Sequence, residues 1–593
     1  FGTYKYAQDH SYSNEEFFTY RFDNDTQSFE TTPIYDGIKT KTTSKYTQSG
    51  MINLSYNYLN ILKLKYTKLY THVGEKKTRM TEGIFGSNKY HYIYYYLDWE
   101  ERTLSADQLS GSFDYKIFNK KSTFDFGLEY ATATLNQPNN FFYADRILDN
   151  GDVRAVVETT LLSRKLYSND EVYAFNFNNK TELDVFSQED FIKFGASFST
   201  KDRTSQYQKF YLAPSKGKDA TDDPYELAGG DVESFLDNYV RQTDNYDDRL
   251  FMISALFDPA DYFDAKVQEQ NYYLHFFSKP FDKVEMSLGV RYANLKQSIF
   301  QYEEDPANNN VVIKTEESLE VNDFFPSLGI KYKHNENNHF DFAASKTFIA
   351  PDLREFTSGK YFHPYDVATV HGNPDLEHTI IYSLDAKYSH YFSDDEYIKV
   401  GAFYKYLEKP IEDTQLDSSS LPIYSYMNSD SATLYGIEFD WRKKLGFISK
   451  GLKNYYVSGN FSYTNSEVTL DPTQLDLLTS NTRQLQGLSQ IVTNVSLGYD
   501  SDSRNIALSY NKMGERIRKV GLINEQGVPY PDSIEVPPHL LDLVWIEKFA
   551  SGLALKLKFG NIIDDEIIWK QGENVSKRFK KGRNISFGIS YKY

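Results

Sequence analysis

The chain ends in the stretch Ile585-Ser586-Phe587-Gly588-Ile589-Ser590-Tyr591-Lys592-Tyr593, in which apolar or aromatic residues alternate with polar or small ones. Successive side chains of a β-strand point to opposite faces, so this alternation predicts a strand with one apolar and one polar face. The same pattern occurs at 52–58, 284–292 and 553–559. Amphipathic strands are therefore expected along the whole chain.

Strand candidates and the connections between them predict a barrel. Short connections are expected at 119–121, 279–282, 334–337 and 501–503. Long connections, rich in Asp, Asn, Gly, Ser and Pro, are expected at 73–88, 135–170, 214–246, 298–318, 350–378, 409–431, 466–488 and 514–537. A barrel with one rim of short turns and one rim of long loops requires both kinds. We predict an all-β fold, a transmembrane antiparallel up-and-down β-barrel of about 22 strands, with residues 1–593 forming one barrel domain.

The composition favours a membrane barrel and excludes several other classes of protein. Tyrosine is abundant, with 50 residues, and its ring and hydroxyl suit the girdles at both membrane interfaces of a barrel. A soluble β-propeller or β-helix is the alternative, but it needs a fixed repeat that this sequence lacks. The net charge of −18 argues against a nucleic-acid partner. The absence of cysteine excludes disulfides and thiolate metal sites.

Three parts of the chain resemble a known family. The first is the block Ala344-Ser-Lys-Thr-Phe-Ile-Ala-Pro-Asp-Leu-Arg-Glu355, followed by Gly372-Asn-Pro-Asp-Leu-Glu377. The second runs from Gly401-Ala-Phe-Tyr-Lys405 to Pro410-Ile-Glu412, and the third is Asn561-Ile-Ile-Asp-Asp565 before the last strand. These motifs resemble the barrel of TonB-dependent outer-membrane transporters.

The resemblance implies a function and a location. It implies TonB-dependent uptake of a scarce nutrient, such as a ferric siderophore, another metal complex, an oligosaccharide or a peptide, through the outer membrane of a Gram-negative bacterium. It also implies contact with the TonB complex through an N-terminal plug, which we expect upstream of Phe1. The alternative is a plugless barrel that serves as a scaffold subunit or a passive pore. The common hydrolase and nucleotide-binding motifs are absent from the sequence, so no enzyme activity and no cofactor are expected.

Candidate ligand-binding residues lie in the loop between the first two motifs. They are Tyr361, His363, Tyr365 and His371. Imidazole and phenolate are sound ligands of ferric haem, and His363 is the better placed of the two histidines because tyrosines flank it. In the family that the chain resembles, however, the two motifs flank this loop whatever the substrate of the member. Solvated loop side chains are therefore the other interpretation.

Three further segments can be interpreted either as functional sites or as ordinary structural features: an acidic loop, a basic cluster and the C-terminal residues. The acidic loop 214–246 offers the oxygen ligands that Ca²⁺ prefers, although without EF-hand spacing, and it also suits a solvated surface. Basic residues between 577 and 583 suit lipopolysaccharide phosphates or a plain polar loop. Outer-membrane lipid and a surface lipoprotein are the further partners considered. The resemblance marks the terminal residues as the signal that the barrel-insertion machinery reads: Phe587, Ile589, Tyr591 and Tyr593.

Overall fold

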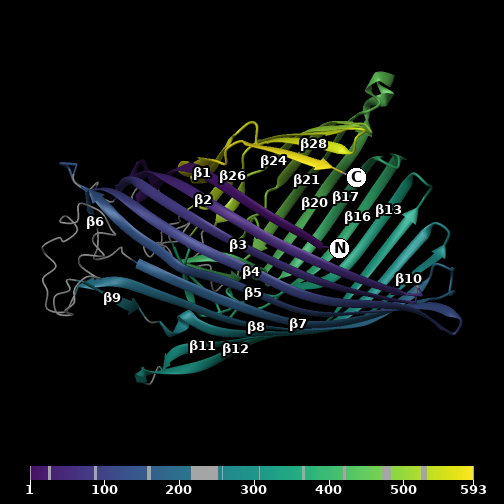
Figure 1. Ribbon diagram of the computed structural model, residues 1–593, viewed down its shortest axis with the longest axis horizontal. Helices are drawn as coiled ribbons and strands as arrows, with labels where there is room; N and C mark the ends of the chain where they lie inside the picture. The colour runs from purple at the N-terminus through teal and green to yellow at the C-terminus, as the bar shows by residue number, and fades with distance from the viewer. Residues whose placement is uncertain are drawn as a thin grey trace.

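The structure is a computed structural model of the chain. It describes residues 2–23, 28–59, 61–85, 90–151, 153–155, 162–214, 251–256, 258–305, 308–363, 368–417, 423–470, 482–521 and 531–591. Nearly all of these residues belong to one large antiparallel sheet that curves round on itself (Figure 1). No described helix is long and apolar enough to cross a membrane.

The sheet consists of strands that run through the chain in order. The first part contains β1 (Gly2–Asp23), β2 (Ser28–Tyr58), β3 (Leu62–Phe85), β4 (Tyr90–Ile117), β5 (Lys120–Ile147), β6 (Val153–Ala155), β7 (Leu162–Glu182), β8 (Phe191–Pro214), β9 (Phe251–Leu256), β10 (Tyr262–Phe281), β11 (Val284–Asp305), β12 (Asn308–Lys333) and β13 (Asn338–Ile349). The second part contains β16 (Thr379–Ser393), β17 (Glu396–Glu408), β20 (Ser431–Lys444), β21 (Tyr455–Thr469), β22 (Thr482–Arg483), β23 (Ile491–Asp500), β24 (Arg504–Met513), β25 (Arg516–Lys519), β26 (Ser533–Val536), β27 (Leu540–Lys548), β28 (Leu553–Gly560), β29 (Glu566–Gln571), β30 (Asn574–Lys580) and β31 (Asn584–Tyr591). Single 3₁₀ turns occur at Pro259–Asp261 (η3), Leu445–Phe447 (η4) and Lys450–Leu452 (η5).

The sheet closes into a barrel. Each long strand pairs with its neighbours in the chain, and β1 pairs with β2 on one side and with β30 on the other. The pairing with β30 joins Glu15–Phe17 to Lys577–Phe579. This pairing joins the two ends of the sheet into a ring, which removes the free strand edge along the paired residues. The predicted antiparallel up-and-down barrel is confirmed, and its sheet contains 27 described strand segments.

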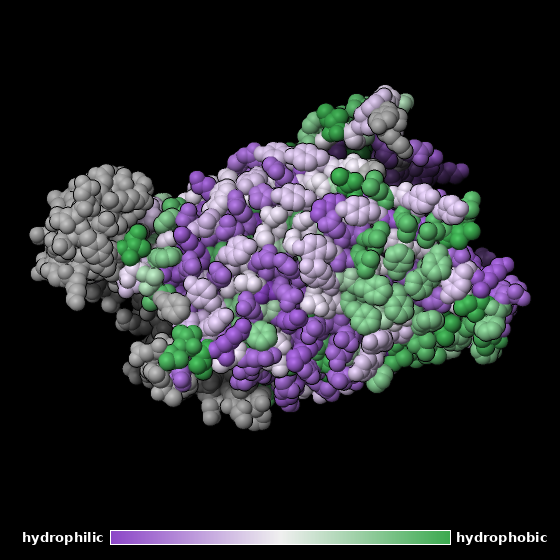
Figure 2. All heavy atoms as spheres, turned by 60° about the horizontal axis from the view of Figure 1, so that its bottom comes forward, coloured by the Kyte–Doolittle hydropathy of each residue, from purple (hydrophilic) through white to green (hydrophobic). Residues whose placement is uncertain are grey.

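Two rows of aromatic side chains mark where the barrel crosses the membrane. In the outer row, ring centroids lie 4.9 Å apart for Tyr130 and Tyr173 and 5.0 Å apart for Tyr292 and Phe324. Nearer the short turns, a second row includes the pair Phe113 and Phe124, at 5.1 Å. On the face shown in Figure 2, apolar side chains gather over the wall near the short-turn end, and most of the remaining surface is polar. We call this exposed apolar surface the lipid band, because barrels carry such girdles at both interfaces.

The early strands continue well beyond the lipid band, which corrects several predicted loops. Residues 73–85 continue β3, residues 135–147 continue β5, and most of 298–318 forms the hairpin of β11 and β12. Outside the membrane neither face of a strand meets lipid, so the apolar alternation that identifies a strand in the sequence disappears. The predicted short connections are all present, and β31 is confirmed as the last strand.

Candidate ligand-binding site

The predicted ligand-binding loop folds into a small sheet of its own. Tyr361 lies in β14 (Lys360–His363) and His371 in β15 (Ala368–His371), and these two strands pair antiparallel. The structure describes the backbone of His363 without its side chain, and Tyr365 lies outside the described residues. Of the four predicted residues, Tyr361 and His371 have described side chains, and they lie on the two paired strands of this loop. Their role as ligand-binding residues stays a prediction.

The small sheet joins two loops that are separate in the sequence. β15 pairs in parallel with β19 (Ile423–Asn428), which pairs with β18 (Ile411–Asp417). Residues 409–431, predicted as a loop, thus contain a hairpin that docks on the loop carrying Tyr361. The alternation Tyr424-Ser425-Tyr426-Met427 in the sequence was the signal for this strand.

Tyr361 meets a partner that the sequence analysis missed. Its hydroxyl lies 2.8 Å from the hydroxyl of Tyr426, and the guanidinium of Arg354 lies 4.8 Å from the centroid of its ring. The Asn373 side-chain amide donates to the backbone oxygen of Tyr426 at 2.9 Å. Two phenols and a cation therefore sit together where the two loops meet.

Burial shifts the pKa values of the two tyrosines and of nearby His371 in the direction that favours their neutral forms. Burial raises the pKa of Tyr361. Burial, followed by the hydrogen bond with Tyr361, raises the pKa of Tyr426 further. Burial and then the charge of Lys360 lower the pKa of His371. At neutral pH the cluster thus offers neutral phenols, which both donate and accept hydrogen bonds.

The G-N-P-x-L motif explains why the loop folds inward. A Cβ at Gly372 would lie 2.0 Å from the backbone oxygen of Thr357, so this position accepts no side chain. Leu376 is buried with Phe356 and Leu353 against Phe263, Ala265 and Ile299 on the inner wall of β10 and β11. Because this contact is apolar and buried, the loop packs into the mouth of the barrel rather than extending into water.

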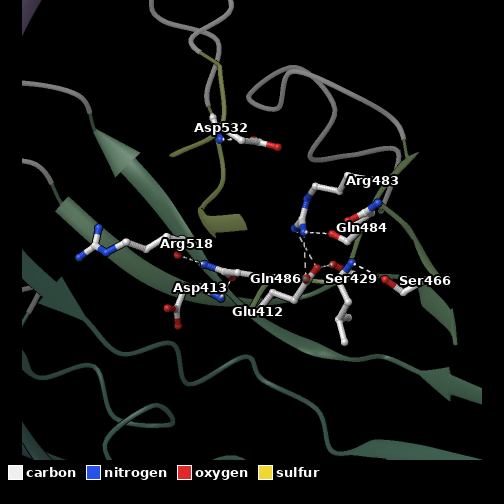
Figure 3. A network of polar contacts seen from close by, with 11 residues as sticks. Glu412, Asp413, Ser429, Ser466, Arg483, Gln484, Gln486, Arg518 and Asp532 are labelled. Carbon is white, nitrogen blue, oxygen red and sulfur yellow. Dashed lines mark hydrogen bonds and ion pairs between the residues drawn. The ribbon is translucent and has the colours of Figure 1, made fainter. Parts of the chain in front are cut away.

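A buried polar network lies beside this cluster, since Glu412 in β18 pairs with Met427, the residue after Tyr426 (Figure 3). Arg483 donates to both carboxylate oxygens of Glu412, each at 2.9 Å, and these two side chains are only 5% and 3% exposed. The Ser429 hydroxyl donates to Glu412 at 2.6 Å. The Gln486 amide donates to the backbone oxygen of Arg518 at 2.9 Å. We call the described parts of loops 350–378, 409–431, 466–488 and 514–537 the loop assembly, since these contacts hold them together.

Two other predicted sites have different outcomes. All of the acidic loop 214–246 except Pro214 lies outside the described residues, so its calcium prediction stays open. The described part of the chain holds no group of three or more His, Cys, Asp or Glu residues suited to a metal ion. In the basic cluster, Lys577 forms a buried ion pair with Glu15 at 2.5 Å and Arg578 pairs with Glu16 at 2.6 Å. These two cations support barrel closure.

The terminal signal residues lie in β31. Ile585, Phe587, Ile589 and Tyr591 are all more than 60% exposed and alternate along one face of the strand. Tyr593 lies outside the described residues. The exposed apolar face agrees with a strand that meets lipid. Recognition of these residues by an insertion machinery stays a prediction.

Comparison with known proteins relates this architecture to one family and to several solved structures. The family described as TonB dependent receptor-like, beta-barrel, matches residues 98–542. The siderophore receptor PiuA from Acinetobacter baumannii superimposes with a TM-score of 0.51 at 10% identity, covering 98% of this chain and 81% of PiuA. The pyoverdine outer membrane receptor FpvA from Pseudomonas aeruginosa PAO1 gives 0.52 at 11% identity, covering 99% and 79%.

A third solved structure is similar to the same extent. The ferric-catecholate import receptor Fiu from E. coli K12 gives a TM-score of 0.52 at 8% identity, covering 98% of this chain and 82% of Fiu. At such identities the likeness shows the fold. No curated protein sequence matches the chain.

Proposed function

This chain belongs to the family of TonB-dependent receptor β-barrels, and we propose that it takes up a ferric siderophore or another bulky metal complex, with an oligosaccharide or a peptide as the further substrate classes. Receptors of this family are transporters, not enzymes, and they work with TonB in the outer membrane of Gram-negative bacteria. The predicted family, fold class, location and absence of enzymatic activity are therefore confirmed. The substrate and its site belong to the proposal.

The observation that carries the proposal is the loop assembly. Transport of a bulky solute needs binding groups at the mouth that are held in place, and the buried Glu412–Arg483 pair and the apolar packing of Phe356 provide that support. Tyr361, Tyr426 and Arg354 then present phenols and a guanidinium, which hydrogen-bond and attract an anionic, oxygen-rich complex. The siderophore complexes named for the similar structures support the same class.

Uptake measurements test the transport function directly. Cells that produce the receptor are given radiolabelled iron as a ferric catecholate, with and without a functional TonB. We expect accumulation only when TonB is functional. Entry that does not depend on TonB would favour a passive pore, and no entry with this probe or with labelled oligosaccharides and peptides would refute the proposed uptake.

The predicted loop residues are tested separately. We propose that the loop carrying Tyr361, His363, Tyr365 and His371 contacts the ligand. Substitutions Tyr361→Phe and His371→Ala are expected to weaken ligand binding without loss of the folded barrel. Titration of haemin against a His363→Ala, His371→Ala double variant tests the haem alternative through the Soret band. An unchanged spectrum for the unsubstituted receptor on adding haemin would eliminate haem.

Lipid, lipopolysaccharide and a surface lipoprotein are further proposed partners of the barrel. We propose that outer-membrane lipid and lipopolysaccharide cover the lipid band, because its large apolar side chains remain exposed, among them Leu54 at 59% and Ile437 at 54%. A surface lipoprotein over the long loops is a prediction that affinity purification from the native membrane tests. Mass measurement of the native polypeptide tests whether a plug precedes the barrel.

A further inference from the structure

The connection between β20 and β21 differs from the other short turns. It spans residues 445–454 and contains η4 and η5, whereas the neighbouring connection between β23 and β24 spans only 501–503. Figure 1 shows it projecting beyond the ends of β20 and β21 and away from the barrel. It is thus the one described short-rim connection that carries helical turns.

The connection has an ordered backbone. Ile448 donates to the backbone oxygen of Leu445 at 3.0 Å, and Leu452 donates to that of Ser449 at 2.9 Å. At Gly446 a Cβ would lie 3.2 Å from the Cα of Lys453, so the two arms of the connection approach closely. A projection held in this way presents fixed side chains.

Those side chains combine exposed apolar surface with positive charge. Phe447 is 71% exposed and Ile448 is 63% exposed, although neither has a place in the barrel wall. Lys450 and Lys453 are exposed beside them and have no ion pair among the described residues. No acidic residue occurs between Asp440 and Glu467 in the sequence. Glu396 and Asp395 pair with Lys443 and Lys444 at the end of β20, so within residues 445–454 the charge is positive only. Positive charge next to apolar side chains suits the surface of an anionic membrane.

The connection also lies at a suitable depth. Trp441, three positions before the end of β20, stacks with Phe439 at 5.0 Å, and Tyr455 at the start of β21 lies 5.0 Å from Tyr499. Tryptophan and tyrosine at a strand end mark the boundary between acyl chains and headgroups. Residues 445–454 follow directly after that boundary on the short-turn side.

We propose that residues 445–454 form an interfacial anchor that inserts Phe447 and Ile448 into the membrane leaflet at the short-turn rim, while Lys450 and Lys453 bind anionic phospholipid headgroups. Lysine reaches such headgroups because its long aliphatic stem lies along apolar surface. The anchor fixes the tilt and depth of this side of the barrel. A soluble protein partner on the same surface would instead keep the side chains away from lipid.

Site-directed spin labelling tests the anchor, because the chain contains no cysteine to interfere. Phe447→Cys and a matched control, Asp502→Cys in the exposed turn between β23 and β24, are labelled and folded into phosphatidylethanolamine vesicles with or without phosphatidylglycerol. Accessibility to oxygen and to a water-soluble nickel chelate then reports depth. We expect the label at 447 to be protected from nickel and open to oxygen, and the label at 502 to be open to nickel.

The lysines are tested in the same labelled background. In vesicles that contain phosphatidylglycerol, a Lys450→Glu, Lys453→Glu double substitution is expected to make the label at 447 accessible to the nickel chelate. Equal nickel accessibility at 447 and 502 in every vesicle would overturn the anchor. If the label at 447 is equally protected from nickel with or without phosphatidylglycerol and with or without the lysine substitutions, the role of anionic lipid would be overturned.

Discussion

Around the outside of the barrel, the rings of Tyr292 and Phe324 lie 5.0 Å apart and Phe324 is exposed, whereas in the mouth Glu412 and Arg483 form a buried ion pair. The lipid band repeats one kind of contact over many strands, so each contact carries a small share of its stability. The loop assembly depends on a few contacts that have no substitute. The barrel wall is therefore expected to tolerate single changes that the mouth does not.

The largest difference is expected from breaking the buried ion pair. Arg483→Met leaves the Glu412 carboxylate buried without its cation, which costs about 3–5 kcal/mol in comparable buried pairs. The loss of stability is local, so we expect faster hydrogen exchange of the backbone amides of β18 and β19. Hydrogen exchange measures this better than a global melting temperature does.

An exposed ion pair provides the control. Arg504 pairs with Glu547 through two hydrogen bonds of 2.7 and 3.0 Å, but it lies near a short turn and is solvated. Arg504→Met is expected to leave hydrogen exchange in the mouth unchanged. An equal response to the two substitutions would contradict the contrast between mouth and wall.

A smaller effect is expected from filling the space at a loop glycine. Gly372→Ala places a methyl group against the backbone of Thr357 and is expected to cost about 1–3 kcal/mol, the range for overpacking. Gly401→Ala in β17 is the matched control, since its Cβ would lie 3.8 Å from the nearest atoms. Limited proteolysis of folded receptor should cut the loop assembly faster only in Gly372→Ala.

Alkaline pH is expected to loosen the mouth of the barrel. The raised pKa values of Tyr361 and Tyr426 mean that folding favours the protonated phenols. Their contribution is complete below the ordinary tyrosine pKa of 10.0 and decreases as the pH rises above it. Hydrogen exchange between pH 8 and 11, corrected for the intrinsic rate, measures the effect. In a Tyr361→Phe, Tyr426→Phe variant the extra loss above pH 10 should disappear.

The smallest effect is expected in the lipid band. Tyr292→Leu removes the ring contacts with Phe324 and Tyr272 and the hydroxyl's hydrogen bond to Asn322 but keeps an apolar side chain, so the loss should be about 0.5–1 kcal/mol. Unfolding in urea from vesicles measures it. A loss as large as that of Arg483→Met would mean that the aromatic row acts as one cooperative unit.

The difference between the lipid band and the mouth also explains which features could be predicted from the sequence. In the lipid band, Ile585, Phe587 and Ile589 must face lipid, so period-two alternation identified β31 directly. In the mouth, Tyr361 finds its partner Tyr426 across two loops, 65 positions away. No local pattern encodes that distance, although the alternation around Tyr426 indicated a strand. The outer part of β3 was missed because strands in water need no apolar face.

The joint between β1 and β30 has a consequence for assembly. The residues that close the ring, Glu15–Phe17 and Lys577–Phe579, stand at opposite ends of the sequence. Loop closure over such a separation makes this contact the slowest of the ladder to find. Until it forms, β1 presents an unpaired edge over these residues, the kind of template on which chains aggregate. A factor that shields the edge of β1 while the last strands arrive would reduce this hazard.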